Sequence, residues 1–280
     1  MSKRKRRKLI IRIICSVLVL LISLLFAFPF IYMILMSFMP SSNAIFEYPP
    51  KIIPIPFTPS NYSNAIRYVG LFKLLGNTLI MVVSSMAIGI TASILVAYGF
   101  ARFNGRGKNV LFVILLSTMM IPWVVTMIPA YVEFEALGWI GTRLPLIIPW
   151  IGGSAFNIFM LRQFMMMVPK ELDEAAIIDG ASRFQILIRI ILPEVQPCIA
   201  TLLVFSFINA WSDYVGPSIY LQDASLYTLS LGMQLFFSAT GTANWAYVMA
   251  ASVMFSLPMV LILLFAQKSF VRGIATSGIK

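Results

Sequence analysis

The feature that most constrains this 280-residue chain is a series of apolar runs, each about twenty residues long. A helix that crosses the bilayer core, which is about 30 Å thick, needs ~20 mainly apolar residues. Charged residues make up only 11% of the chain, whereas a soluble domain is typically about 25% charged. We therefore predict an all-α integral membrane protein. Its expected transmembrane helices, about six, are Arg12–Phe38, Leu74–Phe100, Val110–Val132, Leu144–Met167, Cys198–Leu221 and Asn244–Gln267.

Lysine and arginine are distributed unevenly between the two sides of these predicted helices. Of the 21 cationic residues, 17 fall on the side that holds both termini, and only Lys51, Arg67, Lys73 and Arg143 fall on the other. Cytoplasmic loops carry an excess of Lys and Arg, so we expect a multi-pass protein with cytoplasmic N- and C-termini. The net charge of +11 thus reflects topology, and we expect no nucleic-acid partner. The first apolar run is too long for a signal peptide, so we interpret it as an uncleaved anchor.

Residues 169–197 are the most polar internal stretch, and they carry the pattern of a helix, a sharp turn and a second helix. Pro169 suits a first helical turn, where its missing N–H is not needed. Gly180 can adopt a positive φ and so end a helix. Ser182 and Gln185 have the spacing of a capping box, which predicts that a second helix starts at once. Composition alone also fits an ordinary amphipathic linker between two membrane spans.

The same stretch matches every fixed position of a known motif, EAA-x3-G-x9-I-x-LP. The matching residues are Glu174, Ala175, Ala176, Gly180, Ile190, Leu192 and Pro193. This pattern resembles the cytoplasmic EAA loop of ABC importer permeases. The resemblance implies a type I importer permease fold, with residues 1–280 as a single transmembrane permease domain. It also implies that residues 169–193, Asp179 among them, form a cytoplasmic coupling loop that docks on an ATPase subunit.

Two further segments resemble the same family. The loop Met39–Lys73 holds six prolines and ends near Asn61-Tyr62, which resembles the maltose-permease G-subunit type among carbohydrate importer permeases. The C-terminal segment with Gly273, Gly278 and Lys280 resembles the glycine-rich tail that reaches the ATPase dimer in the maltose permease.

The resemblance implies a set of partners and a location in a bacterial or archaeal cell membrane. The partners would be a second, different permease subunit, two ATP-binding subunits that hold ATP and Mg, an extracytoplasmic sugar-binding protein and membrane lipid. The chain itself should bind no nucleotide, because Gly107-Lys108 precedes Asn109 and lacks the earlier glycine of a phosphate-binding loop. It has no histidine and only Cys15 and Cys198, so we expect no catalytic residue and no metal site.

Polar and aromatic residues within two predicted spans suggest a substrate pathway. Asn157 lies in the fourth span, and Asn209, Trp211, Asp213 and Tyr214 lie in the fifth. Intramembrane polar groups usually face the bundle interior or a watery cavity, and aromatic rings suit sugar faces. Permeases of the carbohydrate family often show a similar run, with asparagine where this chain has Ser212. An interfacial aromatic belt with neighbouring polar groups is the alternative interpretation.

Breaks in the spans are also expected, since Pro122 and Pro129 interrupt the third span. Pro145, Pro149 and Gly152-Gly153 weaken the start of the fourth. Such breaks persist in membranes where neighbouring protein satisfies the freed backbone groups.

The sequence therefore predicts a subunit of an ATP-driven carbohydrate importer that works by alternating access without chemistry on its cargo. An importer of another solute is the first alternative, because the EAA motif does not indicate which substrate is transported. An ion-coupled secondary transporter is the second, but it needs ionisable groups near the bilayer midplane. The carboxylates of Glu133, Glu135 and Asp213 instead fall toward the outer ends of the predicted spans. A membrane scaffold protein would not need the EAA spacing.

Overall fold

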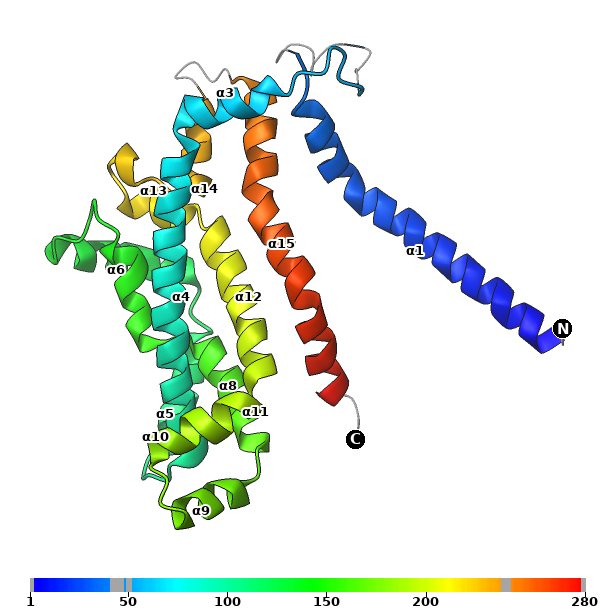
Figure 1. The fold of residues 1–280 in the computed structure, drawn as a ribbon. Coiled ribbons are helices and arrows are strands. Elements are labelled where there is room, and N and C mark those ends of the chain that lie inside the picture. The colour runs from blue at the N-terminus through cyan, green and yellow to red at the C-terminus, as the bar shows by residue number, and fades with distance from the viewer. Residues whose placement is uncertain (1–2, 41–47, 49–51, 238–242, 278–280) are drawn as a thin grey trace. The chain divides into compact units, whose positions relative to one another are not determined.

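The computed structural model describes residues 3–40, 48, 52–237 and 243–277, which are almost wholly helical (Figure 1). Within these ranges the β pairing consists of one isolated bridge between Phe237 and Ala243. The chain divides into two compact units, the first made of Met1–Leu71 with Met233–Leu257 and the second of Phe72–Gly232 with Pro258–Lys280. The single permease domain over residues 1–280 stays a prediction.

The first unit joins the C-terminal end of its first helix to a short helix that follows the proline-rich loop. The Asn61 amide donates to the carbonyls of Ser37 (2.9 Å) and Met39 (2.8 Å), and the Tyr62 hydroxyl shares a 2.8 Å hydrogen bond with the Ser37 hydroxyl. The short helix begins at Ser60, with Pro59 at its N-cap position. The helices of this unit are α1 (Lys3–Met36), α3 (Ser60–Val69), η4 (Met233–Phe236) and the first part of α15 (Trp245–Ser277).

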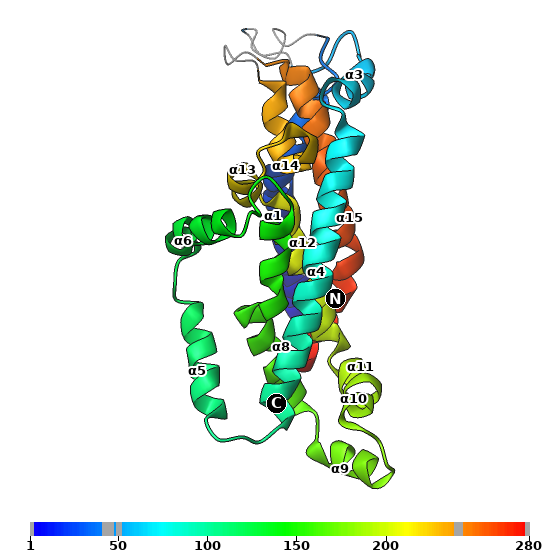
Figure 2. The same ribbon diagram turned by 90° about the vertical axis from the view of Figure 1, so that its left-hand side faces the viewer.

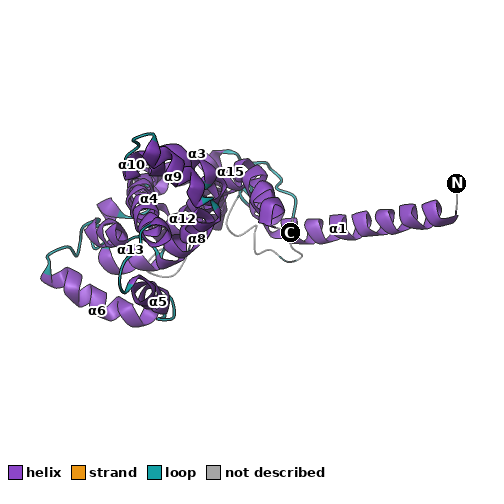
Figure 3. Ribbon diagram, turned by 90° about the horizontal axis from the view of Figure 1, so that it is seen from below, coloured by secondary structure: helices purple, strands orange, loops and turns teal. Residues whose placement is uncertain are grey.

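The second unit is a helical bundle whose longest member is α4, seen beside α8 in Figure 2 and from below in Figure 3. It holds α4 (Leu71–Arg102), α5 (Lys108–Thr118), α6 (Trp123–Ala136), α7 (Leu144–Ile147), η1 (Ile148–Gly152), α8 (Ala155–Met167), α9 (Lys170–Ile178), α10 (Arg183–Ile186), η2 (Leu187–Ile191), α11 (Leu192–Glu194), α12 (Gln196–Ser212), α13 (Val215–Tyr220), η3 (Ala224–Leu226), α14 (Leu229–Gly232) and the end of α15.

Four stretches among the described residues are long and apolar enough to cross a membrane, and two bent helix pairs raise the number to six if each is one span. The prediction of about six membrane helices is confirmed on that count. The four are Lys8–Met36, Leu71–Arg102, Leu144–Met167 and Trp245–Ala266, and the pairs are Lys108–Thr118 with Trp123–Ala136 and Arg183–Glu194 with Gln196–Ser212.

Two predicted spans differ from the structure in shape. The expected span Val110–Val132 is not one helix, because α5 and α6 meet at a 96° bend next to Pro122. Pro122 is extended there and has no N–H to continue α5, whereas Pro129 lies inside α6 without ending it. The expected span Cys198–Leu221 is also divided, since α12 ends at Ser212 and α13 begins two residues after Asp213.

The predicted weak start of the fourth span is confirmed. Helix α4 supplies a hydrogen-bond partner for the backbone at this break. Gly153 has φ +72°, and a Cβ there would lie 2.9 Å from the Ser93 hydroxyl oxygen. That hydroxyl donates to the carbonyl of Gly89 (2.6 Å) and accepts from the backbone N–H of Ser154 (3.0 Å). Small residues on α4 thus let the broken backbone approach closely and stay hydrogen-bonded within the membrane.

The second unit has a shared apolar core where α4, α8 and α12 meet the loop between α8 and α12. Ala97 and Ala101 of α4 pack there with Leu161 and Met165 of α8, and Ile186 and Ile191 belong to the same cluster. The polar loop between α8 and α12 is therefore fixed to the bundle by the apolar side chains that it contributes.

Candidate functional site

The EAA stretch begins with a helix whose first turn is acidic, as its sequence predicts. Pro169 stands at the N-cap with an extended backbone, and α9 runs from Lys170 to Ile178. Glu171 and Asp173 lie in the first turn, where negative charge is favoured by the helix dipole. The proline sits one position before the expected first turn, a difference within the usual uncertainty of helix ends.

Gly180 ends α9 in the way that its position predicts. Its φ is +81°, its N–H donates to the carbonyl of Ile177 (3.0 Å), and the N–H of Ala181 donates to the carbonyl of Ala176 (2.8 Å). These two bonds form the Schellman pattern, which satisfies the last carbonyls of a helix. A residue with a side chain would strain this turn, because the left-handed region costs L-residues roughly 1–2 kcal/mol.

The second helix starts at once, and the predicted capping box is present. The Ser182 hydroxyl accepts from the N–H of Gln185 (3.3 Å), and the Gln185 side chain accepts from the N–H of Ser182 (2.7 Å). The helix then widens into a π-turn over Leu187–Ile191, which the sequence analysis did not anticipate. Pro193 offers a physical reason, because a proline clashes with the carbonyl four residues earlier in a regular α-helix. The wider turn moves that carbonyl away, so the Leu-Pro end of the motif is the signal for it.

The motif residues divide between an exposed surface and a packed side. Glu174, Ala175, Asp179, Gly180 and Pro193 are exposed, whereas Ala176, Ile190 and Leu192 are half-buried. Large apolar side chains are exposed beside the acidic ones, with Ile178 at 86% and Phe184 at 63%. An apolar surface on an otherwise polar loop is typical of a site that binds another protein.

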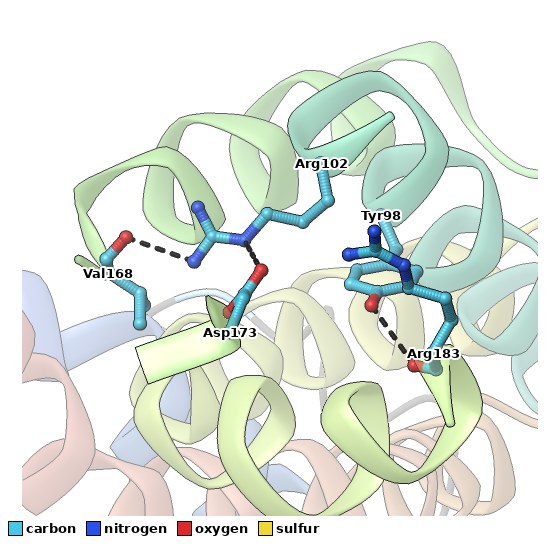
Figure 4. Close-up of polar contacts among 5 residues, drawn as sticks. All are labelled: Tyr98, Arg102, Val168, Asp173 and Arg183. Carbon is cyan, nitrogen blue, oxygen red and sulfur yellow. Dashed lines mark hydrogen bonds and ion pairs between the residues drawn. The ribbon is translucent and has the colours of Figure 1, made fainter. Parts of the chain in front are cut away.

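An ion pair that sequence reasoning missed holds the base of α9. Figure 4 shows Arg102, the last residue of α4, beside Asp173 of α9, with the Arg102 Nε 3.0 Å from Oδ2 of Asp173. The two side chains are only 2% and 7% exposed. Arg102 also donates from Nη2 to the carbonyl of Val168 (2.9 Å), between the end of α8 and the start of α9. One guanidinium therefore joins three helices.

A second contact from α4 holds the start of α10. The Tyr98 hydroxyl donates to the carbonyl of Arg183 at 3.0 Å, as Figure 4 also shows. Nearby, Arg162 of α8 donates from Nε to the carbonyl of Phe100 (3.3 Å), and its guanidinium lies 4.1 Å from the ring centre of Phe112. Arg102 and Arg162 therefore do more than add to the charge asymmetry of the chain, because each also joins neighbouring helices.

The residues proposed for the substrate pathway do not share one environment. Asn157 is buried, and its amide lies 3.5 Å from the Ser206 hydroxyl of α12. Trp211 is 1% exposed and stacks on Phe207, whereas Asn209 and Tyr214 are exposed. Asp213 is half-buried and accepts from the N–H of Gly216 at 3.1 Å. Their common role in a pathway stays a prediction.

The predicted tail contact lies mostly beyond the described part of the chain. Gly273 falls within α15, and Gly278 and Lys280 are outside the described residues. Within the described residues, no group of three or more Cys, Asp or Glu side chains is placed to hold a metal ion.

Comparison with known proteins gives a consistent picture. The family described as "Binding-protein-dependent transport system inner membrane component" matches residues 89–276. The chain is 32% identical to the sn-glycerol-3-phosphate transport system permease protein of Agrobacterium fabrum, over 95% of this chain and 96% of that protein. It is 29% identical to the trehalose/maltose transport system permease protein of Thermococcus litoralis, over 98% and 99% of the two chains.

A solved structure has the same fold. It is a chain from a bacterial ABC transporter involved in the import of the acidic polysaccharide alginate, with a TM-score of 0.79 and 24% identity. The match covers 96% of this chain and 98% of that chain.

Proposed function

Because this chain belongs to the family of binding-protein-dependent transport system inner membrane components, we propose that it is the permease subunit of an ATP-driven carbohydrate importer. It is a multi-pass membrane protein of the ABC transporter class, as the family and its apolar helices together indicate. The importer would move its cargo by alternating access, without covalent chemistry on the cargo.

The observation that carries this proposal is the exposed surface of α9 and α10. It joins acidic and apolar side chains on a helix whose start, stop and attachment to the bundle are all fixed by hydrogen bonds and an ion pair. A short rigid helix with an apolar surface suits a groove on another protein. We propose that this groove belongs to an ATPase subunit, and that ATP and Mg are held by two such subunits.

The remaining partners follow from the family's dependence on a binding protein. We propose an extracytoplasmic binding protein that delivers the cargo, and a second permease subunit that completes the pathway. The cationic residues of the α9–α10 loop and the chain termini would face the cytoplasm of a bacterial or archaeal cell. On this orientation the tail with Gly273, Gly278 and Lys280 reaches the ATPase dimer.

The cargo that fits best is a neutral saccharide. Relatives carry names of saccharide transport, and the proposed pathway residues offer amide, carboxylate and aromatic groups. A phosphorylated polyol is the second candidate, supported by the 32% identical glycerol-phosphate relative. An ion-coupled carrier has no support from the family.

Purification of the native complex by a tag on this chain tests the proposal. The complex should contain ATPase subunits, and ATP hydrolysis in proteoliposomes should rise when its binding protein and a cargo are added. A panel of maltose, trehalose, sn-glycerol 3-phosphate and glutamine separates the cargo classes. Stimulation by glutamine alone would end the carbohydrate assignment, and absence of any ATPase would end the importer assignment.

A further inference from the structure

Asp173 differs from the other acidic residues of the coupling loop. Glu171, Glu174 and Asp179 are exposed, as expected for carboxylates on a polar cytoplasmic helix. The side chain of Asp173 is 7% exposed and faces the guanidinium of Arg102, whose side chain is 2% exposed. A buried charge is strongly unfavourable unless it is paired, so this position requires Arg102.

The ion pair connects α9 to the end of α4, so a displacement of α9 would be passed to the bundle at this point. Arg102 is the last residue of α4, and Ala97, Tyr98 and Ala101 of that helix lie in the core shared with α8 and α12. A displacement of α9 that keeps the pair intact therefore moves the cytoplasmic end of α4.

A second contact from α4 fixes the orientation of the loop. Tyr98 and Arg102 are four residues apart, so their side chains emerge on the same face of α4. Tyr98 holds the first residue of α10, while Arg102 holds the first turn of α9, on the other side of the Gly180 turn. One contact would let the loop rotate about it, whereas two contacts fix its orientation relative to α4.

The ion pair also keeps unused hydrogen-bonding capacity. Within the described residues, Nε and Nη1 of Arg102 and Oδ1 of Asp173 have no hydrogen-bond partner, so the 3.0 Å contact between Nε and Oδ2 is an ion pair without a hydrogen bond. The two groups touch through one nitrogen and one oxygen, although an arginine and a carboxylate can bond through two of each. The same groups can thus meet through other atoms when α9 shifts, without being separated.

We propose that Arg102 and Asp173 are a positioning pair that carries displacement of the coupling helix α9 to the membrane helix α4. The inference rests on the proposed importer function and adds to it the residues and the helix that receive the movement. A role in packing alone predicts loss of stability when the pair is broken. A role in transmission predicts, in addition, a loss of coupling between ATP hydrolysis and transport.

The test uses the purified complex in proteoliposomes, with uptake of whichever panel cargo the wild type transports measured beside ATP hydrolysis. Asp173→Asn keeps the shape of the side chain and removes its charge. We expect the amount of cargo moved per ATP to fall at least about fivefold, the lower end of typical coupling between sites. Glu194→Gln is the matched control, because it removes an exposed carboxylate near the same loop and should leave this ratio unchanged.

A second variant separates transmission from packing. Arg102→Met with Asp173→Leu replaces the pair by apolar side chains, a change that often preserves stability. We expect this variant to assemble and hydrolyse ATP with a ratio still at least about fivefold low. A wild-type ratio in either variant would overturn the proposal, as would loss of assembly in both. A wild-type complex without ATP-driven uptake would instead contradict the proposed function.

Discussion

The EAA loop, residues 169–193, and the stretch around Trp211 were both singled out from sequence, yet the structure organises them differently. In the EAA loop, Gly180 and Ser182 perform the predicted backbone roles through bonds between residues at most five positions apart. In the Trp211 stretch, Trp211 is buried while Asn209 and Tyr214 are exposed, and no local rule predicts which. Local chemistry therefore specifies where a helix starts and stops, and packing between distant segments decides what a polar side chain faces.

The largest effect is expected at Gly180, where the local backbone geometry determines the turn. Gly180→Leu should abolish transport while membrane insertion and expression stay normal. A Cβ at this position would meet no atom within 4 Å, so the damage comes from the positive φ and not from crowding. The readouts are cargo uptake and ATPase subunits retained on purification. Normal uptake at normal expression would show that the turn is not needed for docking.

A smaller effect is expected in the Trp211 stretch. Asp213→Ala should reduce transport several-fold while basal ATP hydrolysis persists, and Tyr227→Ala should reduce it less. Asp213 accepts from the N–H of Gly216 and stands at the break between α12 and α13, whereas the Tyr227 carbonyl, which survives substitution, makes the bond to Asn77. Uptake assays on both variants in the same complex decide the order. Equal uptake in the two would count against a pathway through Asp213.

Gly153 and Gly180 have similar positive φ angles, but neighbouring atoms crowd only the first of the two. Gly153→Ala should destabilise the protein more than Gly180→Ala, because the new Cβ would lie 2.9 Å from the Ser93 hydroxyl as well as at positive φ. Left-handed strain costs roughly 1–2 kcal/mol, and overpacking adds about 1–3 kcal/mol. Thermal unfolding of the detergent-solubilised variants measures the difference. Equal midpoints would mean that α4 moves away from the break at little cost.

The same distinction explains what the sequence predicted and what it did not. The membrane helices, the Gly180 stop and the break at Pro122 follow from composition or from residues adjacent in the chain. The Arg102–Asp173 pair joins residues 71 positions apart, and no spacing rule connects them. Once the structure shows that Ala176 is half-buried, the three-residue spacing places Asp173 on the same, packed face of α9. An acidic residue on the packed face of a helix predicts a cationic partner.

The smallest effect is expected from Ser182→Ala, which alters the cap of α10 and leaves the Gly180 turn before it unchanged. Ser182→Ala removes the hydroxyl that accepts from the N–H of Gln185, and loss of an N-cap typically costs ~1 kcal/mol. The Gly180 turn and the Tyr98 contact with the Arg183 carbonyl do not use this hydroxyl, so transport should fall by less than twofold. Ser182→Thr keeps a hydroxyl cap and is the control for thermal stability and uptake. A loss of uptake in Ser182→Ala as large as in Gly180→Leu would mean that the capping box, and not the glycine turn, sets the orientation of the docking surface.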